Sequence, residues 1–197
     1  ADDDFSKNKS IAELTDWNIY SPVWAPVSLD GKWLRLQDKD PFDYAKVERK
    51  IPASKELKVS FDMQAGQNDK GTLQIEFLDE NGIACSRLEL TQDGVFRAKG
   101  GSRFANMMKY EAGKTYHVEA VLSTADRNIQ VYVDGKRVGL RMFYAPVASI
   151  ERIAFRTGMP RTFPTVDTPA DQTYDLPGAG EQEPMTEYRI ANVKTSS

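Results

Sequence analysis

Hydrophobic and polar residues alternate with a period of two along most of the chain, which is the pattern of half-buried β-strands. In residues 57–63 every second side chain is apolar and the side chains between them are polar. Further strands are expected in segments with the same or a similar pattern: 33–37, 44–51, 73–77, 83–90, 94–99, 116–122, 129–133, 136–140, 153–155 and 187–194. No long segment has the apolar stripe of an α-helix, and residues 7–15 are the best candidate, for about two turns.

Short turn sequences separate the predicted strands. Asn81-Gly82, Asp93-Gly94 and Asp134-Gly135 contain residues that tolerate positive φ, as tight hairpin turns require. Many short strands joined by such turns are typical of sandwiches and barrels. The sequence therefore predicts an all-β domain of roughly ten to fourteen strands.

Two long segments interrupt the strand pattern. Residues 99–114 are flanked by glycine and are basic, and residues 158–185 contain five of the ten prolines. Loops of this length are uncommon in compact domains and usually serve a function or are disordered. A strand pattern resumes directly after the second segment, so we expect residues 1–197 to form one β-sandwich domain with a long Pro-rich loop at 158–185.

The composition limits the kinds of partner. The chain has 197 residues, with 26 Lys and Arg against 29 Asp and Glu, and a formal net charge of −3. This near-neutral balance disfavours nucleic acid or anionic lipid as the main partner. No apolar run approaches the length of a membrane span. The chain begins without an initiator Met, which indicates a processed protein or an excised domain, and Cys85 has no second cysteine with which to pair.

The order of strands and turns resembles the concanavalin A-like lectin/glucanase superfamily, including the laminin-G-like jelly rolls. The resemblance is carried by the succession 57–63, 73–79, 83–90 and 95–98, by the hairpin 131–138 and by a closing strand at 188–194. It implies two antiparallel sheets packed as a sandwich, with the closing strand near the N-terminal strand. It also implies a polar concave face, which in this superfamily binds or cleaves polysaccharide.

Two catalytic chemistries follow from the resemblance. The glucanases of the superfamily carry Glu-x-Asp-x-x-Glu on one strand, and the comparable residues 73–79 keep only Glu76 as an acid on the polar face. The lyases of this fold use a His or Tyr near an Arg, and their Gln-x-His pair reads Gln74-Ile75-Glu76 here. If the protein is an enzyme, the candidate catalytic residues are His117, Tyr132, Glu76 and Arg87. A solvent-facing histidine without a role is the alternative for His117.

Sugar binding without catalysis needs planar polar groups that bridge pairs of hydroxyls, together with flat aromatic faces. The predicted strands supply such groups, and the carbohydrate-binding candidates are Asp62, Gln64, Gln74, Glu76, Arg87, Glu89, Arg97 and Tyr132. If these side chains line one concave groove, binding or catalysis is favoured, and the alternative is a plain solvated face. The three tryptophans within the first 33 residues are more typical of core or edge cover.

Carboxylates in the Pro-rich segment are a candidate metal site. Asp167, Asp171 and Asp175 recur every four residues, and extended loops of this kind supply oxygen ligands to a structural Ca²⁺. Exposed acids that only aid solubility are the alternative. Zinc is disfavoured because the chain has one His and one Cys.

Basic residues late in the chain are a candidate patch for an acidic glycan. The patch would comprise Lys136, Arg137, Arg141, Arg152, Arg156 and Arg161. Scattered surface charge, balanced by nearby acids, is the alternative.

The leading hypothesis is a non-catalytic carbohydrate-binding or accessory module of an exported polysaccharide-processing protein, placed outside the cell, in the periplasm or at the cell surface. This is an inference from the predicted fold, which does not by itself determine function. The first alternative is a polysaccharide lyase or glycoside hydrolase acting on the concave face. The second is a structural module that docks against a catalytic domain of the same polypeptide.

Overall fold

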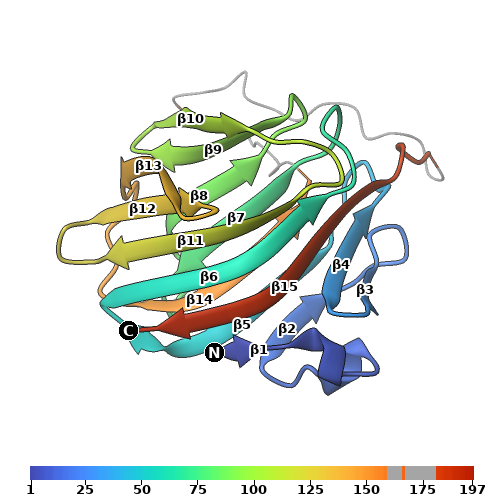
Figure 1. Ribbon diagram of the computed structural model, residues 1–197, viewed down its shortest axis with the longest axis horizontal. Coiled ribbons are helices and arrows are strands. Elements are labelled where there is room, and N and C mark those ends of the chain that lie inside the picture. The colour runs from blue at the N-terminus through green and yellow to red at the C-terminus, as the bar shows by residue number, and fades with distance from the viewer. Residues whose placement is uncertain (159–165, 167–180) are drawn as a thin grey trace.

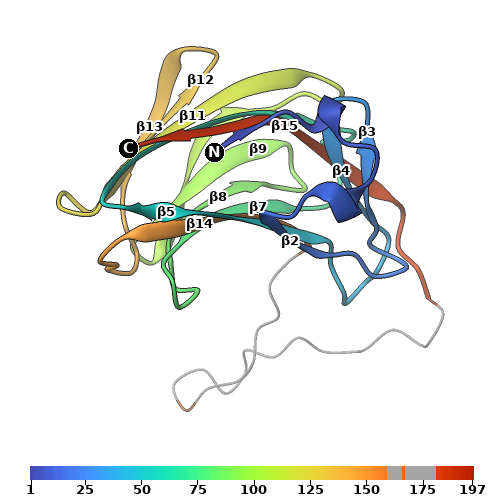
Figure 2. The ribbon, with the colours of Figure 1, turned by 90° about the horizontal axis from the view of Figure 1, so that it is seen from below.

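A computed structural model describes residues 1–158, 166 and 181–197, in which fifteen strands form two antiparallel sheets (Figure 1). Sheet A has the strand order β13-β12-β11-β6-β15-β4-β3, with β1 also paired to β15. Sheet B has the strand order β10-β9-β8-β7-β14-β5-β2. Figure 2 shows the two sheets as separate layers, with β15 and β11 in one layer and β7, β14 and β5 in the other. The all-β sandwich predicted from the sequence is confirmed.

The strand bounds agree with the predicted alternation over most of the chain. The bounds in sheet A are β1 Asp2–Asp3, β3 Val27–Asp30, β4 Trp33–Asp38, β6 Glu56–Ala65, β11 Thr115–Ser123, β12 Asn128–Val133, β13 Lys136–Met142 and β15 Thr186–Ser196. The bounds in sheet B are β2 Trp17–Tyr20, β5 Lys46–Ser54, β7 Leu73–Leu78, β8 Ala84–Leu90, β9 Val95–Gly100, β10 Arg103–Lys109 and β14 Ile150–Thr157. In β6, for example, alternate residues are fully buried, so one face of each sheet packs inward and the other remains polar.

Aromatic side chains join the two sheets in the core. The ring of Phe155 from sheet B meets that of Phe61 from sheet A edge to face, with centroids 5.2 Å apart. Trp17 stacks on Phe155 at 6.4 Å and meets Phe5 at 5.5 Å. Trp17 is therefore a core residue, as expected for a tryptophan near the chain start, and it anchors the N-terminal segment against the sandwich.

The two chain termini lie side by side at one end of the sandwich (Figure 1). β1 pairs with the end of β15 through Asp2 opposite Lys194, and the N-terminal amine of Ala1 donates a hydrogen bond to Oγ1 of Thr195. The predicted pairing of the closing strand near the N-terminal strand is confirmed. β15 has eleven residues, so its first residue lies about 35 Å from its last, at the opposite end of the sandwich.

The prediction that residues 99–114 form a non-strand segment is wrong, because residues 103–109 form the edge strand β10. This strand pairs with β9 from Arg103 opposite Gly100 to Lys109 opposite Val95. A bulge between Asn106 and Met108 breaks the strict alternation, so the segment lacks the period of two that marks a strand. The short strands β2 and β3 were also not expected, and residues 7–15 contain only the 3₁₀ turn Ile11–Glu13, next to a second such turn at Phe5–Lys7.

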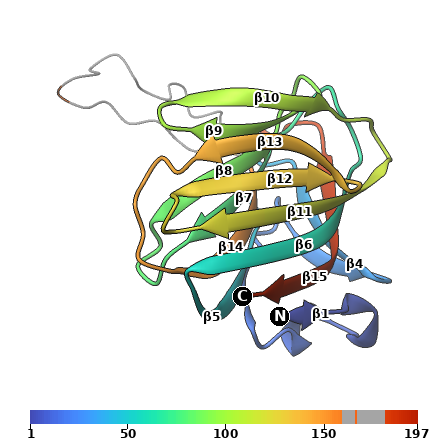
Figure 3. The same cartoon turned by 60° about the vertical axis from the view of Figure 1, so that its left-hand side comes forward.

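One long side of the sandwich is closed where the edges of the two sheets meet. In Figure 3, β13 of sheet A lies beside β9 and β10 of sheet B. The approach is close at two glycines: a Cβ on Gly139 would lie 2.6 Å from the sulfur of Met107, and one on Gly100 would lie 3.2 Å from the Arg141 side chain. In the described part of the chain, no helix is long and apolar enough to cross a membrane.

Candidate functional site

The predicted binding residues lie on two opposite outer faces of the sandwich. Asp62, Gln64, His117 and Tyr132 belong to β6, β11 and β12, which are strands of sheet A. Gln74, Glu76, Arg87, Glu89 and Arg97 belong to β7, β8 and β9, which are strands of sheet B. The expectation that residues 62, 74, 76, 87 and 97 line one groove is therefore wrong, because strand alternation determines which side chains point outward but not which sheet a strand joins.

The sheet A group forms small local hydrogen-bonded sets. Nδ1 of His117 lies 2.8 Å from Oδ1 of Asp62, and the Asn192 side chain donates to the other Asp62 oxygen at 2.6 Å. Gln64 donates to the carbonyl of Gly113 at 2.7 Å. The lyase candidates are consequently divided: the sandwich core separates His117 and Tyr132 from Glu76 and Arg87.

The outer face of sheet B carries a continuous row of polar side chains across six strands. Backbone pairing places these residues opposite one another from strand to strand. We call this set the upper row, which runs Lys46, Arg156, Gln74, Glu89, Arg97 and Asn106 from β5 to β10. It lies near the end of the sandwich opposite the chain termini.

Glu89 is the centre of the upper row. Its carboxylate accepts hydrogen bonds from Nε and Nη2 of Arg97 at 3.0 and 2.6 Å, and from the Gln74 amide at 3.3 Å. Glu89 is 2% exposed, so these charge-assisted bonds hold a nearly buried ion pair. The amide oxygen of Gln74 is buried and has no hydrogen-bond partner in the part of the chain that the structure describes. The row therefore presents an acceptor whose hydrogen-bonding capacity is unused.

A second set of ion pairs lies below the upper row. Arg87 bonds to Glu76 at 3.0 Å, and Arg152 bonds to Glu48 at 3.2 Å. Burial acts to raise the pKa of Glu48, but the hydrogen bond from Asn18 and the charges of the neighbouring basic side chains lower it overall. Glu48 is thus held in its ionised form.

A hollow of about 240 Å³ opens beside the upper row at the ends of β8 and β9. Glu89, Arg97 and Asn106 line one part of it, and the rim residues include Thr72 and Gln92. The guanidinium of Arg97 lies over the ring of Phe104, 4.1 Å from its centroid, which fixes the cation against an aromatic face. The hollow thus combines planar hydrogen-bonding groups with a nearby ring.

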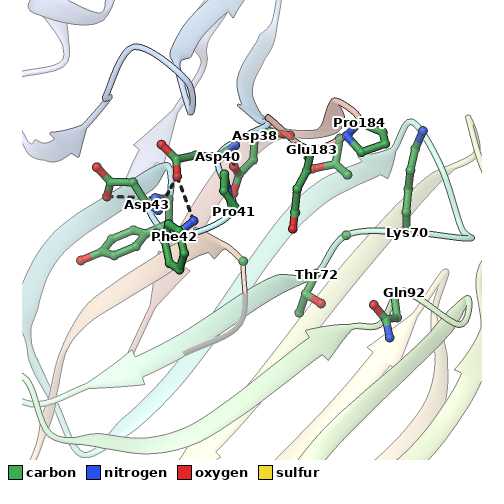
Figure 4. Close-up of a pocket in the computed structure, with 14 residues that line it drawn as sticks. Asp38, Asp40, Pro41, Phe42, Asp43, Lys70, Thr72, Gln92, Glu183 and Pro184 are labelled. Carbon is green, nitrogen blue, oxygen red and sulfur yellow. Dashed lines mark hydrogen bonds between the residues drawn. The ribbon is translucent and has the colours of Figure 1, made fainter. Parts of the chain in front are cut away.

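A larger pocket of about 370 Å³ adjoins this hollow and shares Thr72 and Gln92 with it. Figure 4 shows the acidic loop with Asp40 and Asp43 on one side of this pocket and Lys70 on the other. Gly71 at its wall has φ +74°, and a Cβ there would lie 2.6 Å from the Thr186 side chain, so only glycine fits.

Asp38 is the buried carboxylate of this pocket. It is 7% exposed and accepts hydrogen bonds from the Thr157 hydroxyl at 2.7 Å and from the backbone N–H of Asp40 at 2.9 Å. Burial raises the pKa of Asp38 to about 6, aided by the negative charges of Asp40 and Glu183 and opposed by these two hydrogen bonds. The charge of the pocket therefore changes near pH 6.

Several functional candidates on this face were not predicted as site residues from the sequence. Tyr44 lies in the loop before β5, and the Arg156 guanidinium stacks on its ring at 3.9 Å. Tyr144 follows β13, and its ring contacts both Lys99 at 4.4 Å and Arg87 at 5.7 Å. Tyr44 falls within the predicted strand 44–51 but lies just before β5, and neither tyrosine was singled out because their contacts are with residues far away in the chain.

The predicted metal ligands and basic patch are only partly covered by the structure. Asp167, Asp171, Asp175 and Arg161 lie outside the described residues. Within residues 1–158, 166 and 181–197, no group of three or more His, Cys, Asp or Glu side chains is arranged to hold a metal ion. Of the remaining basic residues, Arg152 and Arg156 are on β14 of sheet B, whereas Lys136, Arg137 and Arg141 are on β13 of sheet A. The five described residues of the predicted patch are therefore divided between two sheets.

Comparisons with known proteins relate this geometry to a family. A family model described as "Sialidase-like, CBM domain" matches residues 17–172. The chain is 88% identical to a solved structure entitled "Sialidase", with a TM-score of 0.92, and the match covers 100% of this chain and 18% of that one. The chain thus spans less than a fifth of that relative. No protein of curated function matches the sequence.

Other solved structures share the fold at low sequence identity. The structure entitled "Cellulose induced protein, Cip1" has a TM-score of 0.62 at 14% identity, covering 100% of this chain and 97% of that one. The alginate lyase AlgAT5 of polysaccharide lyase family 7 has a TM-score of 0.57 at 14% identity, covering 93% and 95%. These similarities confirm the concanavalin A-like fold implied by the sequence.

Proposed function

The chain belongs to the family of sialidase-like CBM domains, an accessory carbohydrate-binding module, and from this premise we propose that it binds glycans through the outer face of sheet B. The binding surface comprises the upper row and the hollow of about 240 Å³ beside it. The module serves a larger, extracellular or surface-exposed sialidase-type protein, for which it holds the glycan substrate close. The 18% coverage of the sialidase relative supports this placement within a longer polypeptide.

The observation that carries the proposal is the polar row beside a hollow with unused hydrogen-bonding groups. Sugar hydroxyls are bound by planar amide, carboxylate and guanidinium groups, which offer two donors or acceptors at fixed spacing. Asn106 and Gln92 are exposed amides at the hollow. Farther along the upper row, next to Glu89, the buried Gln74 oxygen has no protein partner in the described structure. On the outer face of sheet A, by contrast, the His117 ring and the Gln64 amide already bond to their neighbours.

The pairing of the carboxylates supports binding rather than hydrolysis. A glycosidase needs one carboxylic acid with a raised pKa to protonate the leaving group, and a second carboxylate across the scissile bond. On the outer face of sheet B, the Glu76 and Glu89 carboxylates are each bound by an arginine, and the pKa of Glu48 is lowered. Each of these three carboxylates therefore has a basic partner or a lowered pKa. Asp38, whose pKa is raised, lies in the adjoining pocket, where its carboxylate is already bonded to Thr157 and to the Asp40 backbone.

A glycan-binding assay with matched variants tests this function. The purified chain is screened on an array of neutral and acidic oligosaccharides, and the Kd of the strongest ligand is measured by calorimetry. The double variant Gln92→Ala/Asn106→Ala is expected to weaken binding about tenfold or more, because two net hydrogen bonds are lost. Gln64→Ala, which removes an amide from the outer face of sheet A, is the control and is expected to bind normally.

Three outcomes would overturn the proposal. The first is that no glycan on the array binds. The second is that Gln64→Ala weakens binding more than the double variant, because the site would then lie on sheet A. The third is release of reducing ends or unsaturated uronates by the purified chain, because the module would then be catalytic.

A further inference from the structure

The outer face of sheet B is basic, although the whole chain has a net charge of −3. Three carboxylates, Glu48, Glu76 and Glu89, lie on this face among strands β5 to β9. The basic side chains there number seven and are Lys46, Lys50, Arg87, Arg97, Lys99, Arg152 and Arg156. An excess of positive charge on one face of an acidic protein favours a negatively charged ligand at that face.

The excess lies in the basic side chains of this face that have no carboxylate partner in the described structure. Each carboxylate of the face is bonded to an arginine, and Lys46 lies 3.4 Å from Glu48. Lys50, Lys99 and Arg156 have no carboxylate partner in the described part of the chain. Of these three, Arg156 and Lys99 each lie over the ring of a tyrosine. The arginine pairs are Arg152 with Glu48 at 3.2 Å, Arg87 with Glu76 at 3.0 Å and Arg97 with Glu89 at 2.6 Å.

Arg156 has the environment of an anion anchor. Its guanidinium lies over the ring of Tyr44, 3.9 Å from the centroid, so the ring covers one planar face of the cation. Its Nε is buried and has no hydrogen-bond partner in the described structure. The neighbouring residue on β7 is Gln74, whose buried amide oxygen is also unpartnered. A stacked, unpaired guanidinium is suited to bidentate binding of a carboxylate, while an adjacent amide binds a hydroxyl.

We propose that this face selects glycans that carry a carboxylate, with Arg156 binding the carboxylate and Gln74 an adjacent hydroxyl. This inference rests on the proposed function and specifies its ligand class. Lys99, stacked on Tyr144 across the sheet, is a second cation for a longer acidic glycan. β9 lies three strand spacings from β14, about 14 Å, so the two cations contact different sugar residues.

Pairs of ligands that differ only in one carboxylate test the inference. Calorimetry on the intact chain compares a sialylated lactose with lactose, and a uronate trisaccharide with its carboxyl-reduced form. The acidic member of at least one pair is expected to bind about tenfold more tightly, with an advantage that shrinks as salt is added. The pair that shows the advantage identifies the acidic sugar as sialic acid or uronate.

Variants on one strand separate a specific anchor from net charge. Arg156→Gln is expected to lower the affinity for the acidic ligand to that of the neutral one, and Arg156→Lys to lose part of the advantage because it keeps the charge but not the fork. Arg152→Gln removes the same charge from the same face, four residues earlier on β14. This variant is expected to keep the preference for the acidic ligand. Unfolding curves for each variant show whether the fold is retained.

The inference is overturned if charged and neutral members bind equally, or if Arg152→Gln loses as much preference as Arg156→Gln. In either case glycan binding itself persists and the proposed function stands. Binding of no glycan at all would overturn both proposals.

Discussion

The buried carboxylate of Asp38 makes the stability of the protein depend on pH in a direction that can be worked out. Its pKa is raised from the ordinary 3.8 to about 6 in the folded protein. The folded state therefore binds the proton more tightly than the unfolded state, and the free energy of unfolding falls as the pH rises through this window. The separation of the two pKa values corresponds to about 3 kcal/mol lost above pH 6 and regained below pH 4.

The variant Asp38→Asn isolates this contribution, because asparagine cannot ionise but keeps the size of the side chain. The free energies of unfolding of both proteins are measured by urea denaturation with tryptophan fluorescence between pH 4 and pH 8. The difference is expected to change by about 2 kcal/mol across this range, in favour of the variant at high pH. Asp93→Asn, which removes an exposed acid from the adjoining hollow, reports the effect of a lost charge alone.

A difference between wild type and Asp38→Asn that stays constant from pH 4 to pH 8 would refute the reasoning. The burial of Asp38 would then not disfavour its ionised form. The same result from Asp93→Asn as from Asp38→Asn would assign the pH dependence to the general charge of the rim instead.

Three further expectations concern the core and the polar face. Phe155→Ala removes the ring that joins Trp17 to Phe61 and is expected to cost about 3–5 kcal/mol in urea denaturation, and a loss below 1 kcal/mol would contradict the packing described. Glu89→Gln leaves the Arg97 guanidinium without its carboxylate and is expected to cost about 2 kcal/mol, with the fold retained in circular dichroism. Cys85 is fully buried and burial raises its pKa to about 12, so it should react with a disulfide reagent such as Ellman's only at the rate of unfolding, and fast labelling of the native protein would be inconsistent with this.

The fold could be predicted from the sequence because alternation records burial locally. Every second side chain in β6 and β11 is buried, and this pattern can be recognised from neighbouring residues in the sequence alone. β10 was missed because its bulge breaks the alternation and because an edge strand is only partly covered.

The candidate site was only half predictable for a related reason. The sequence identified Gln74, Glu89 and Arg97 as outward-facing polar residues, and the structure places them together in one row. It also grouped Asp62, Gln64 and Tyr132 with them, although β6 and β12 belong to the other sheet, because sheet membership depends on pairing between distant segments. The stacking of Arg156 on Tyr44 was invisible for the same reason, since the two residues are far apart in the chain.

The two chain termini lie at one end of the sandwich and the upper row lies near the other end. A polypeptide continuing from Ala1 or from Ser197 would leave the sandwich at the end opposite the pocket with Asp38 and Gln92. A captured glycan would then be held at a distance set by the length of the sandwich plus the connecting segment. The effective concentration of glycan at an attached active site depends on that distance. Shortening or stiffening the connecting segment would therefore change the avidity of the whole protein, while the Kd of the module alone would stay the same.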